Sequence, residues 1–70
     1  MTAAETCRQN GWEKGDVLEG DEGYGPERIL LTAIGESAIL ARTIFRRGEP
    51  VDERECLWSL ECRDWRKVTG

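Results

Sequence analysis

Three tryptophans, Trp12, Trp58 and Trp65, bracket a strongly β-forming stretch, Arg28 to Phe45, in a chain of 70 residues. A tryptophan buries a large apolar area and leaves one indole N–H to satisfy, so a short chain has little room for several. We expect the three rings either to lock the ends of a small β-barrel together or to line the one pocket that such a barrel can hold.

The length of the chain limits the fold to one domain, near the lower limit for independent folding. A core of this size supplies only about 3–5 kcal/mol, so we expect association into a homo-oligomer to add buried surface. The chain has no histidine, and Cys7, Cys56 and Cys62 lack the paired CxxC spacing of a zinc site. We therefore expect no cofactor or metal and three reduced thiols, two of them in the core.

The charge distribution restricts the class of partner. The net charge of −4 argues against a binder of duplex DNA or of RNA in general, because such proteins are normally basic. Residues 13–22 are mostly acidic, whereas Arg42, Arg46 and Arg47 fall close together, which leaves scope for a local basic pocket. The N-terminal residues do not resemble a signal peptide, and no apolar run approaches the roughly 20 residues of a membrane span. We expect a cytoplasmic protein without a membrane partner.

The order of the predicted elements indicates the fold. Residues 1–11 predict a short helix from Thr2 to Asn10, with Thr2 as its N-cap, Glu5 in a capping box and Gly11 as its stop. Residues 16–68 predict a barrel whose strands cover 17–20, 28–34, 38–45, 56–60 and 65–68, with one helical turn at 62–64. This mainly β order, with a short N-terminal helix, is that of a small SH3-like five-stranded barrel. Within it, Trp58 is expected on a central strand, on the same core-facing side as Cys56 and Leu60.

The sequence contains no catalytic signature, so we expect a protein that is not an enzyme. Histidine, the commonest general base, is absent, and no serine lies in a nucleophile elbow. The glycine-rich loop from Gly20 to Gly25 lacks the Lys-Ser/Thr ending of a phosphate loop and does not lead into a helix. The carboxylates of residues 16–22 lie in a turn-rich stretch, where acidic side chains usually face water.

Arginines beside aromatic residues are typical of a nucleotide-binding pocket, in which the ring stacks on the base and the guanidinium binds the phosphate. Arg42 and Arg46 lie four residues apart on one predicted strand and, by strand alternation, should point to the same face. Arg28 opens the neighbouring strand of that hairpin. The predicted ligand-binding residues are Trp12, Tyr24, Arg28, Arg42, Arg46 and Trp65. The alternative is that the arginines pair with Glu53 or Glu55 on a solvated face and that the aromatic rings belong to the core.

A set of short motifs spans nearly the whole chain: Gly11-Trp12, Gly15-Asp16, Gly20-Asp21-Glu22-Gly23, Ile34-Gly35-Glu36, Ile39-Leu40-Ala41, Leu57-Trp58-Ser59-Leu60 and Arg63-Asp64-Trp65. This pattern resembles a family of short proteins from tailed phages and prophages. The resemblance implies a phage origin and hence the cytoplasm of a host bacterium. Small phage proteins without catalytic residues are often accessory, and many counteract host defence by binding a host protein or by sequestering a nucleotide immune signal.

These observations together favour a phage-encoded, non-catalytic binding protein. We expect it to counteract bacterial immunity as an oligomer that sequesters a small anionic nucleotide. One alternative is an inhibitor that binds a host defence protein directly through the acidic surface of residues 13–22. Another is a structural or regulatory component of the phage.

Overall fold

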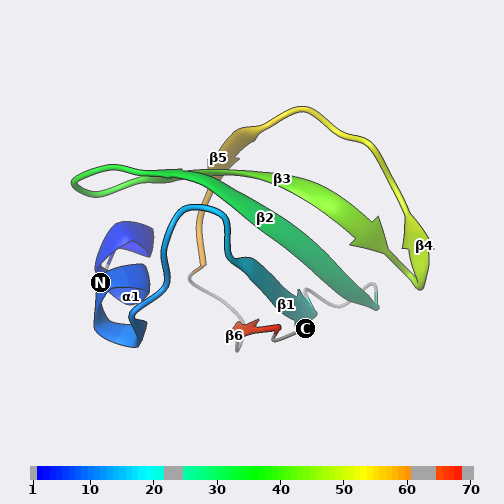
Figure 1. Ribbon diagram of the computed structural model, residues 1–70, viewed down its shortest axis with the longest axis horizontal. Helices are drawn as coiled ribbons and strands as arrows, with labels where there is room; N and C mark the ends of the chain where they lie inside the picture. The colour runs from blue at the N-terminus through cyan, green and yellow to red at the C-terminus, as the bar shows by residue number, and fades with distance from the viewer. Residues whose placement is uncertain (1, 22–24, 61–64, 69–70) are drawn as a thin grey trace.

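An antiparallel sheet and a short helix form the fold in the computed structural model, which describes residues 2–21, 25–60 and 65–68 (Figure 1). The expected class, mainly β with a short N-terminal helix, is confirmed, and the arrangement is consistent with a small barrel. In chain order the described elements are α1 (Ala3–Asn10), β1 (Val17–Asp21), β2 (Pro26–Ile34), β3 (Ile39–Arg46), β4 (Glu49–Pro50), β5 (Cys56–Trp58) and β6 (Arg66–Lys67).

Helix α1 begins and ends where the sequence predicts. The Thr2 hydroxyl accepts a hydrogen bond from the backbone N–H of Glu5 at 3.1 Å, and the Glu5 carboxylate accepts one from the N–H of Thr2 at 3.3 Å. Gly11 ends the helix in the left-handed region at φ 72°, and its N–H donates to the carbonyl of Arg8. Eight residues are too few for a helix that is stable alone, so α1 depends on its contacts with the sheet.

Those contacts fasten α1 beneath the turn between β2 and β3 (Figure 1). The Arg8 guanidinium donates to the carbonyls of Gly35 and Glu36 at 3.1 and 2.9 Å, and the N–H of Ala4 donates to the carbonyl of Ser37 at 3.3 Å. The inward-facing residues of the helix are buried against the core: Ala3, Ala4 and Cys7. The helix therefore covers one end of the sheet.

The strand order is β4-β3-β2-β1-β6, and β5 also pairs with β3. Strands β4 and β5 pair with opposite ends of the same long strand, since Phe45 lies opposite Pro50 whereas Ile39 lies opposite Trp58. Where the sequence predicts five strands, the described residues contain six, because residues 49–50, which lie between two predicted strands, pair as β4. The last predicted strand is present in shorter form as β6 and pairs with β1. The predicted helical turn at 62–64 lies outside the described residues.

Two register shifts bend the hairpin of β2 and β3. Ile29 lies opposite Thr43 and Arg28 lies opposite Phe45, so Ile44 is an extra residue on β3. Leu31 lies opposite Ala41 and Ala33 opposite Leu40, so Thr32 is an extra residue on β2. Each extra residue reverses the faces of the side chains that follow it along its strand and sharpens the local twist.

The core lies on the inner face of the sheet, against α1. Leu18, Ile29, Leu31 and Ile39 are almost fully buried there, and Trp12 and Trp65 are each only 9% exposed. Trp12 and Trp65, which the sequence analysis placed among the ligand-binding residues, are thus core residues. They close the barrel where the chain leaves α1 and where it enters β6.

Trp58 is packed against this core but is only partly buried. Its ring meets that of Trp65 edge to face, with the ring centroids 5.7 Å apart. The expectation of a central strand is wrong for Trp58, because β5 pairs only with β3 among the described strands. Cys56 is exposed on that short strand rather than buried beside Trp58, although Leu60 is buried as expected.

Gly20 leaves the space that the Trp65 ring occupies. A Cβ atom on residue 20 would lie 2.6 Å from Cδ2 of Trp65, far inside van der Waals contact. We expect Gly20→Ala to lower the free energy of unfolding by about 1–3 kcal/mol, because the indole must move in a close-packed core. Thermal unfolding followed by tryptophan fluorescence measures the change, and Glu49→Ala, on exposed β4, is the control. A Gly20→Ala variant as stable as the wild type would mean that the indole does not pack on residue 20.

Candidate functional site

A row of paired side chains crosses the sheet from β6 to β4 on its outer face. Arg66 lies opposite Glu19, Glu19 opposite Arg28, Arg28 opposite Phe45, and Phe45 opposite Pro50. The row faces away from the core, because its neighbours Leu18 and Ile29 point inward and strand residues alternate. Five strands thus bring together residues that lie as far as 47 positions apart in the chain.

The centre of the row is a carboxylate held by two guanidinium groups. Nη2 of Arg66 donates to Oε2 of Glu19 at 2.7 Å, and Nε of Arg28 donates to Oε1 at 3.1 Å. These hydrogen bonds hold the pKa of Glu19 below its usual value, and the bond from Arg66 has the larger effect. The guanidinium carbon of Arg28 also lies 5.8 Å from the centroid of the Phe45 ring, within the range of a cation–π contact.

Two neighbouring hollows flank this carboxylate. The first, of about 300 Å³, is lined by Glu19, Gly20, Asp21, Pro26 and Arg66. The second, of about 210 Å³, is lined by Glu19, Pro26, Arg28, Phe45 and Gly48. Because Glu19 and Pro26 line both, the hollows form one shallow groove along the outer face, which we call the Glu19 groove. It combines guanidinium groups, an aromatic ring and proline, the chemistry expected where a ligand has both a charged and a flat apolar part.

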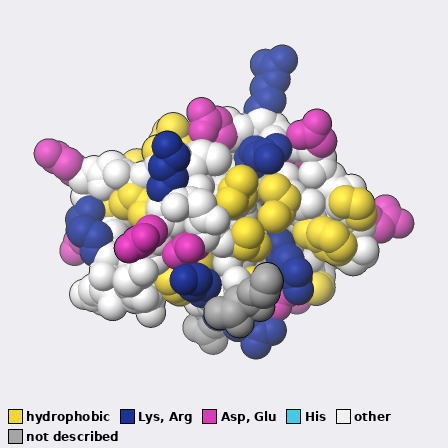
Figure 2. Space-filling view, in the orientation of Figure 1, with side chains coloured by type: hydrophobic (Ala, Val, Ile, Leu, Met, Phe, Trp, Pro, Cys, Tyr) yellow, Lys and Arg dark blue, Asp and Glu magenta, His cyan; other side chains and the backbone are white. Residues whose placement is uncertain are grey.

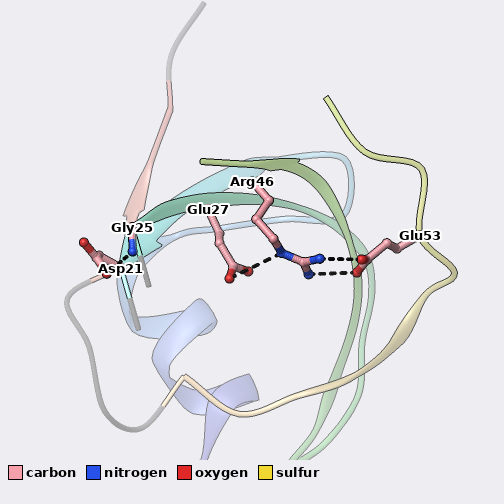
Figure 3. Close-up of polar contacts among 5 residues, drawn as sticks. All are labelled: Asp21, Gly25, Glu27, Arg46 and Glu53. Carbon is pink, nitrogen blue, oxygen red and sulfur yellow. Dashed lines mark hydrogen bonds and ion pairs between the residues drawn. The ribbon is translucent and has the colours of Figure 1, made fainter. Parts of the chain in front are cut away.

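Arg46 lies on the other face, in an ion cluster of its own. Its Nε is 3.6 Å from the Glu27 carboxylate, and its two terminal nitrogens donate to Glu53 at 2.6 and 3.0 Å (Figure 3). The bidentate bond to Glu53 is the main reason why the pKa of Arg46 is raised and that of Glu53 is lowered. Thr43, buried on the inner face, adds a smaller contribution to the lowered pKa of Glu53.

The expectation that Arg42 and Arg46 share a face is therefore wrong. Arg42 lies opposite Leu30 on the outer face, while Arg46 lies opposite Glu27 on the inner side, because Ile44 is the extra residue between them. Arg42 forms an ion pair with the exposed Asp52 at 3.3 Å. Arg28 lies opposite Phe45 and does not join the other two arginines. Of the six residues predicted to bind a ligand, Arg28 alone lines the Glu19 groove among those that the structure describes.

Tyr24 lies outside the described residues, whereas Asp21 and Pro26, which precede and follow that part of the sequence, line the groove. The carboxylate of Asp21 accepts a hydrogen bond from the backbone N–H of Gly25 at 3.2 Å (Figure 3), and Pro26 follows in the lining. Glu19 and Phe45 were not among the residues predicted to bind a ligand. The alternation of Glu19 with the buried Leu18 was a usable signal for Glu19, whereas strict alternation along β3 would place Phe45 on the inner face, because Ile44 is an extra residue. The pairing of Glu19 with Arg66 and of Phe45 with Arg28 depends on the register of distant strands.

The charges on the surface are mixed rather than segregated. Figure 2 shows basic and acidic side chains interspersed around a group of hydrophobic ones on the face that it presents. The acidic segment of residues 13–22 is partly compensated, since Asp16 forms an ion pair with Lys67 at 3.5 Å and Glu19 is held by two arginines. Compensation of this kind leaves the segment less negative than its composition indicates.

The described part of the chain contains two of the three cysteines, both as free thiols. No three His, Cys, Asp or Glu side chains there are placed to hold a metal ion. Cys7 is a free thiol whose burial raises its pKa, and Cys56 is free and exposed, whereas Cys62 is not described. No helix within residues 2–21, 25–60 and 65–68 is long and apolar enough to cross a membrane.

The chain belongs to the family described as Domain of unknown function (DUF7241), whose model matches residues 1–70. No curated protein and no solved structure matches the chain.

The Arg46–Glu53 pair predicts a dependence of stability on pH. Because the pKa of Glu53 is lowered in the folded state, the pair stabilises the fold above the usual glutamate value of 4.5, and this contribution is lost as the pH falls through the lowered value. We expect Glu53→Gln to lower the melting temperature at neutral pH and the difference from the wild type to shrink at about pH 3.

Melting curves across this pH range measure the effect, and Glu49→Gln, an exposed glutamate of β4, is the matched control. A difference between Glu53→Gln and the wild type that stays constant down to the acid end would show that the carboxylate charge does not contribute.

Proposed function

We propose that this protein is a non-catalytic binding module that captures a small anionic nucleotide in the Glu19 groove. The observation that carries the proposal is the row of Arg66, Glu19, Arg28 and Phe45 across the outer face, with hollows on both sides of Glu19. Guanidinium groups bind phosphate oxygens in a fixed fork, and aromatic or guanidinium planes accept a stacked base.

Each of the two hollows suits a different part of the ligand. The hollow beside Phe45 and Pro26 is the more apolar setting and suits the base, which can stack on the Arg28 guanidinium where it rests against the Phe45 ring. The hollow beside Arg66 suits the phosphate, because that side chain is largely exposed and its charge faces solvent.

The biological form of the proposal is sequestration of a nucleotide signal of bacterial immunity by a phage-encoded protein in the host cytoplasm. The resemblance to short phage proteins supports this part. The alternative, direct inhibition of a host defence protein through the acidic segment, has less support from the geometry, because Asp16 and Glu19 are already paired with basic side chains.

Calorimetric titration with cyclic and ADP-ribose-derived nucleotides tests the binding. We expect at least one of them to bind, and Arg28→Ala to weaken that binding about tenfold or more, because it removes a charge-assisted contact and a stacking surface. Arg54→Ala is the matched control, since Arg54 is exposed in the connector between β4 and β5 and loses the same charge. If no nucleotide binds the wild type, the proposal fails, and a host protein that co-purifies would favour the alternative.

We also propose that the chain acts as a homo-oligomer. Leu57 is 72% exposed on β5, and it lies opposite Leu40 on the outer face, so this end of the sheet offers apolar surface to a second copy. We expect sedimentation at micromolar concentration to show a species larger than a monomer, and Leu57→Ser to shift it toward the monomer. A wild-type chain that sediments as a clean monomer would contradict this expectation.

A further inference from the structure

The two arginines of the Glu19 groove are already bound to an anionic group of the protein itself. Arg28 and Arg66 donate to different oxygens of one carboxylate, which bridges them as an external anion would. The Glu19 side chain is 21% exposed, while those of Arg28 and Arg66 are 44% and 78% exposed. The carboxylate therefore approaches the arginines from the protein side, and their outer sides face the solvent.

Among the described residues, this arrangement uses only part of the hydrogen-bonding capacity of the two arginines. Ion pairs on the surface contribute modestly to stability, because solvent screens the charges and both side chains lose conformational freedom. A guanidinium has five N–H donors, and within the described residues the hydrogen bonds of Arg28 and Arg66 to Glu19 each use one of them. The remaining donors of two convergent arginines border hollows that have room for a ligand.

We infer that Glu19 is a built-in competitor for the ligand's acidic group, and that the group it yields to is a phosphate or diphosphate that bridges Arg28 and Arg66. This inference rests on the proposed function and adds to it the class of anion and the reason why that anion is selected. A terminal phosphate monoester or a diphosphate carries close to two negative charges and at least three acceptor oxygens, whereas Glu19, like a single phosphodiester, offers one charge and two oxygens. The phosphate can therefore displace the carboxylate, which a singly charged ligand cannot do to the same extent.

Inorganic pyrophosphate is the probe, because it supplies the phosphate chemistry without a base. Glu19→Gln keeps the size of the side chain and removes the competing charge. We expect it to bind pyrophosphate about tenfold more tightly than the wild type in calorimetric titration, as the loss of one competing charge-assisted contact implies. Arg66→Ala added to Glu19→Gln should remove this gain.

Glu49→Gln is the control for net charge, since it changes the total charge of the chain equally but lies on exposed β4 outside the groove. If both glutamine variants gain the same affinity, the effect is one of overall charge and the inference is overturned. Circular dichroism shows whether each variant folds. Glu19→Asp, whose shorter side chain cannot reach both guanidinium groups equally, should give an affinity between those of the wild type and Glu19→Gln.

The outcomes separate this inference from the proposed function. If nucleotides bind the wild type but neither Glu19 variant binds pyrophosphate more tightly, the competitor role is overturned while the nucleotide site stands. If Glu19→Gln gains pyrophosphate affinity through Arg66 but no nucleotide binds the wild type, the phosphate site stands and nucleotide capture does not. If no variant binds pyrophosphate at all, the inference is overturned.

Discussion

The two extra residues in the β2–β3 hairpin are the constraint on which the rest of the structure depends. Ile44 on β3 and Thr32 on β2 each shift the register by one residue. The same two residues anchor the connector between β4 and β5, because the carbonyl of Ile44 accepts a hydrogen bond from the N–H of Val51 and the hydroxyl of Thr32 donates to the Glu55 carboxylate. The shifts that bend the sheet thus also fix the path by which the chain returns to pair with β3.

Local sequence signals were sufficient for the elements whose contacts are local. The capping box and the Gly11 stop define α1 within a few residues, and the branched residues on both sides of a short turn define the hairpin. The register shifts were beyond such signals, because no residue type at position 44 marks it as the extra one. Strict alternation from Arg42 therefore placed Arg46 on the wrong face. The same limit affected the tryptophans, since whether Trp12 and Trp65 enter the core depends on how the two ends of the chain meet.

An arginine beside an aromatic ring could be expected from the sequence, whereas the particular residues that line the groove could not. The combination of arginine with an aromatic ring was expected, and the structure provides it as Arg28 beside Phe45. In the sequence, Glu19 is not distinguished from the other acidic residues of a turn-rich stretch. In the structure, its place opposite both Arg28 and Arg66 makes it the centre of the groove. A pairing between β1 and β6 joins residues 19 and 66, and no local pattern carries that information.

In the proposed function, the balance of charge in the groove bears on which anions are selected. Two guanidinium groups without a neighbouring carboxylate attract any anion, including the abundant singly charged anions of a cell. Such small anions would occupy the site, and the salt would also screen its attraction for a larger ligand. A carboxylate held between them raises the interaction free energy that a ligand needs in order to bind. The incoming ligand must interact more favourably with both arginines than Glu19 already does. A ligand with two negative charges and a stacked ring meets that requirement through contacts with separate strands. On a chain with a net charge of −4, selection by the number and spacing of charges is therefore more effective than selection by attraction alone.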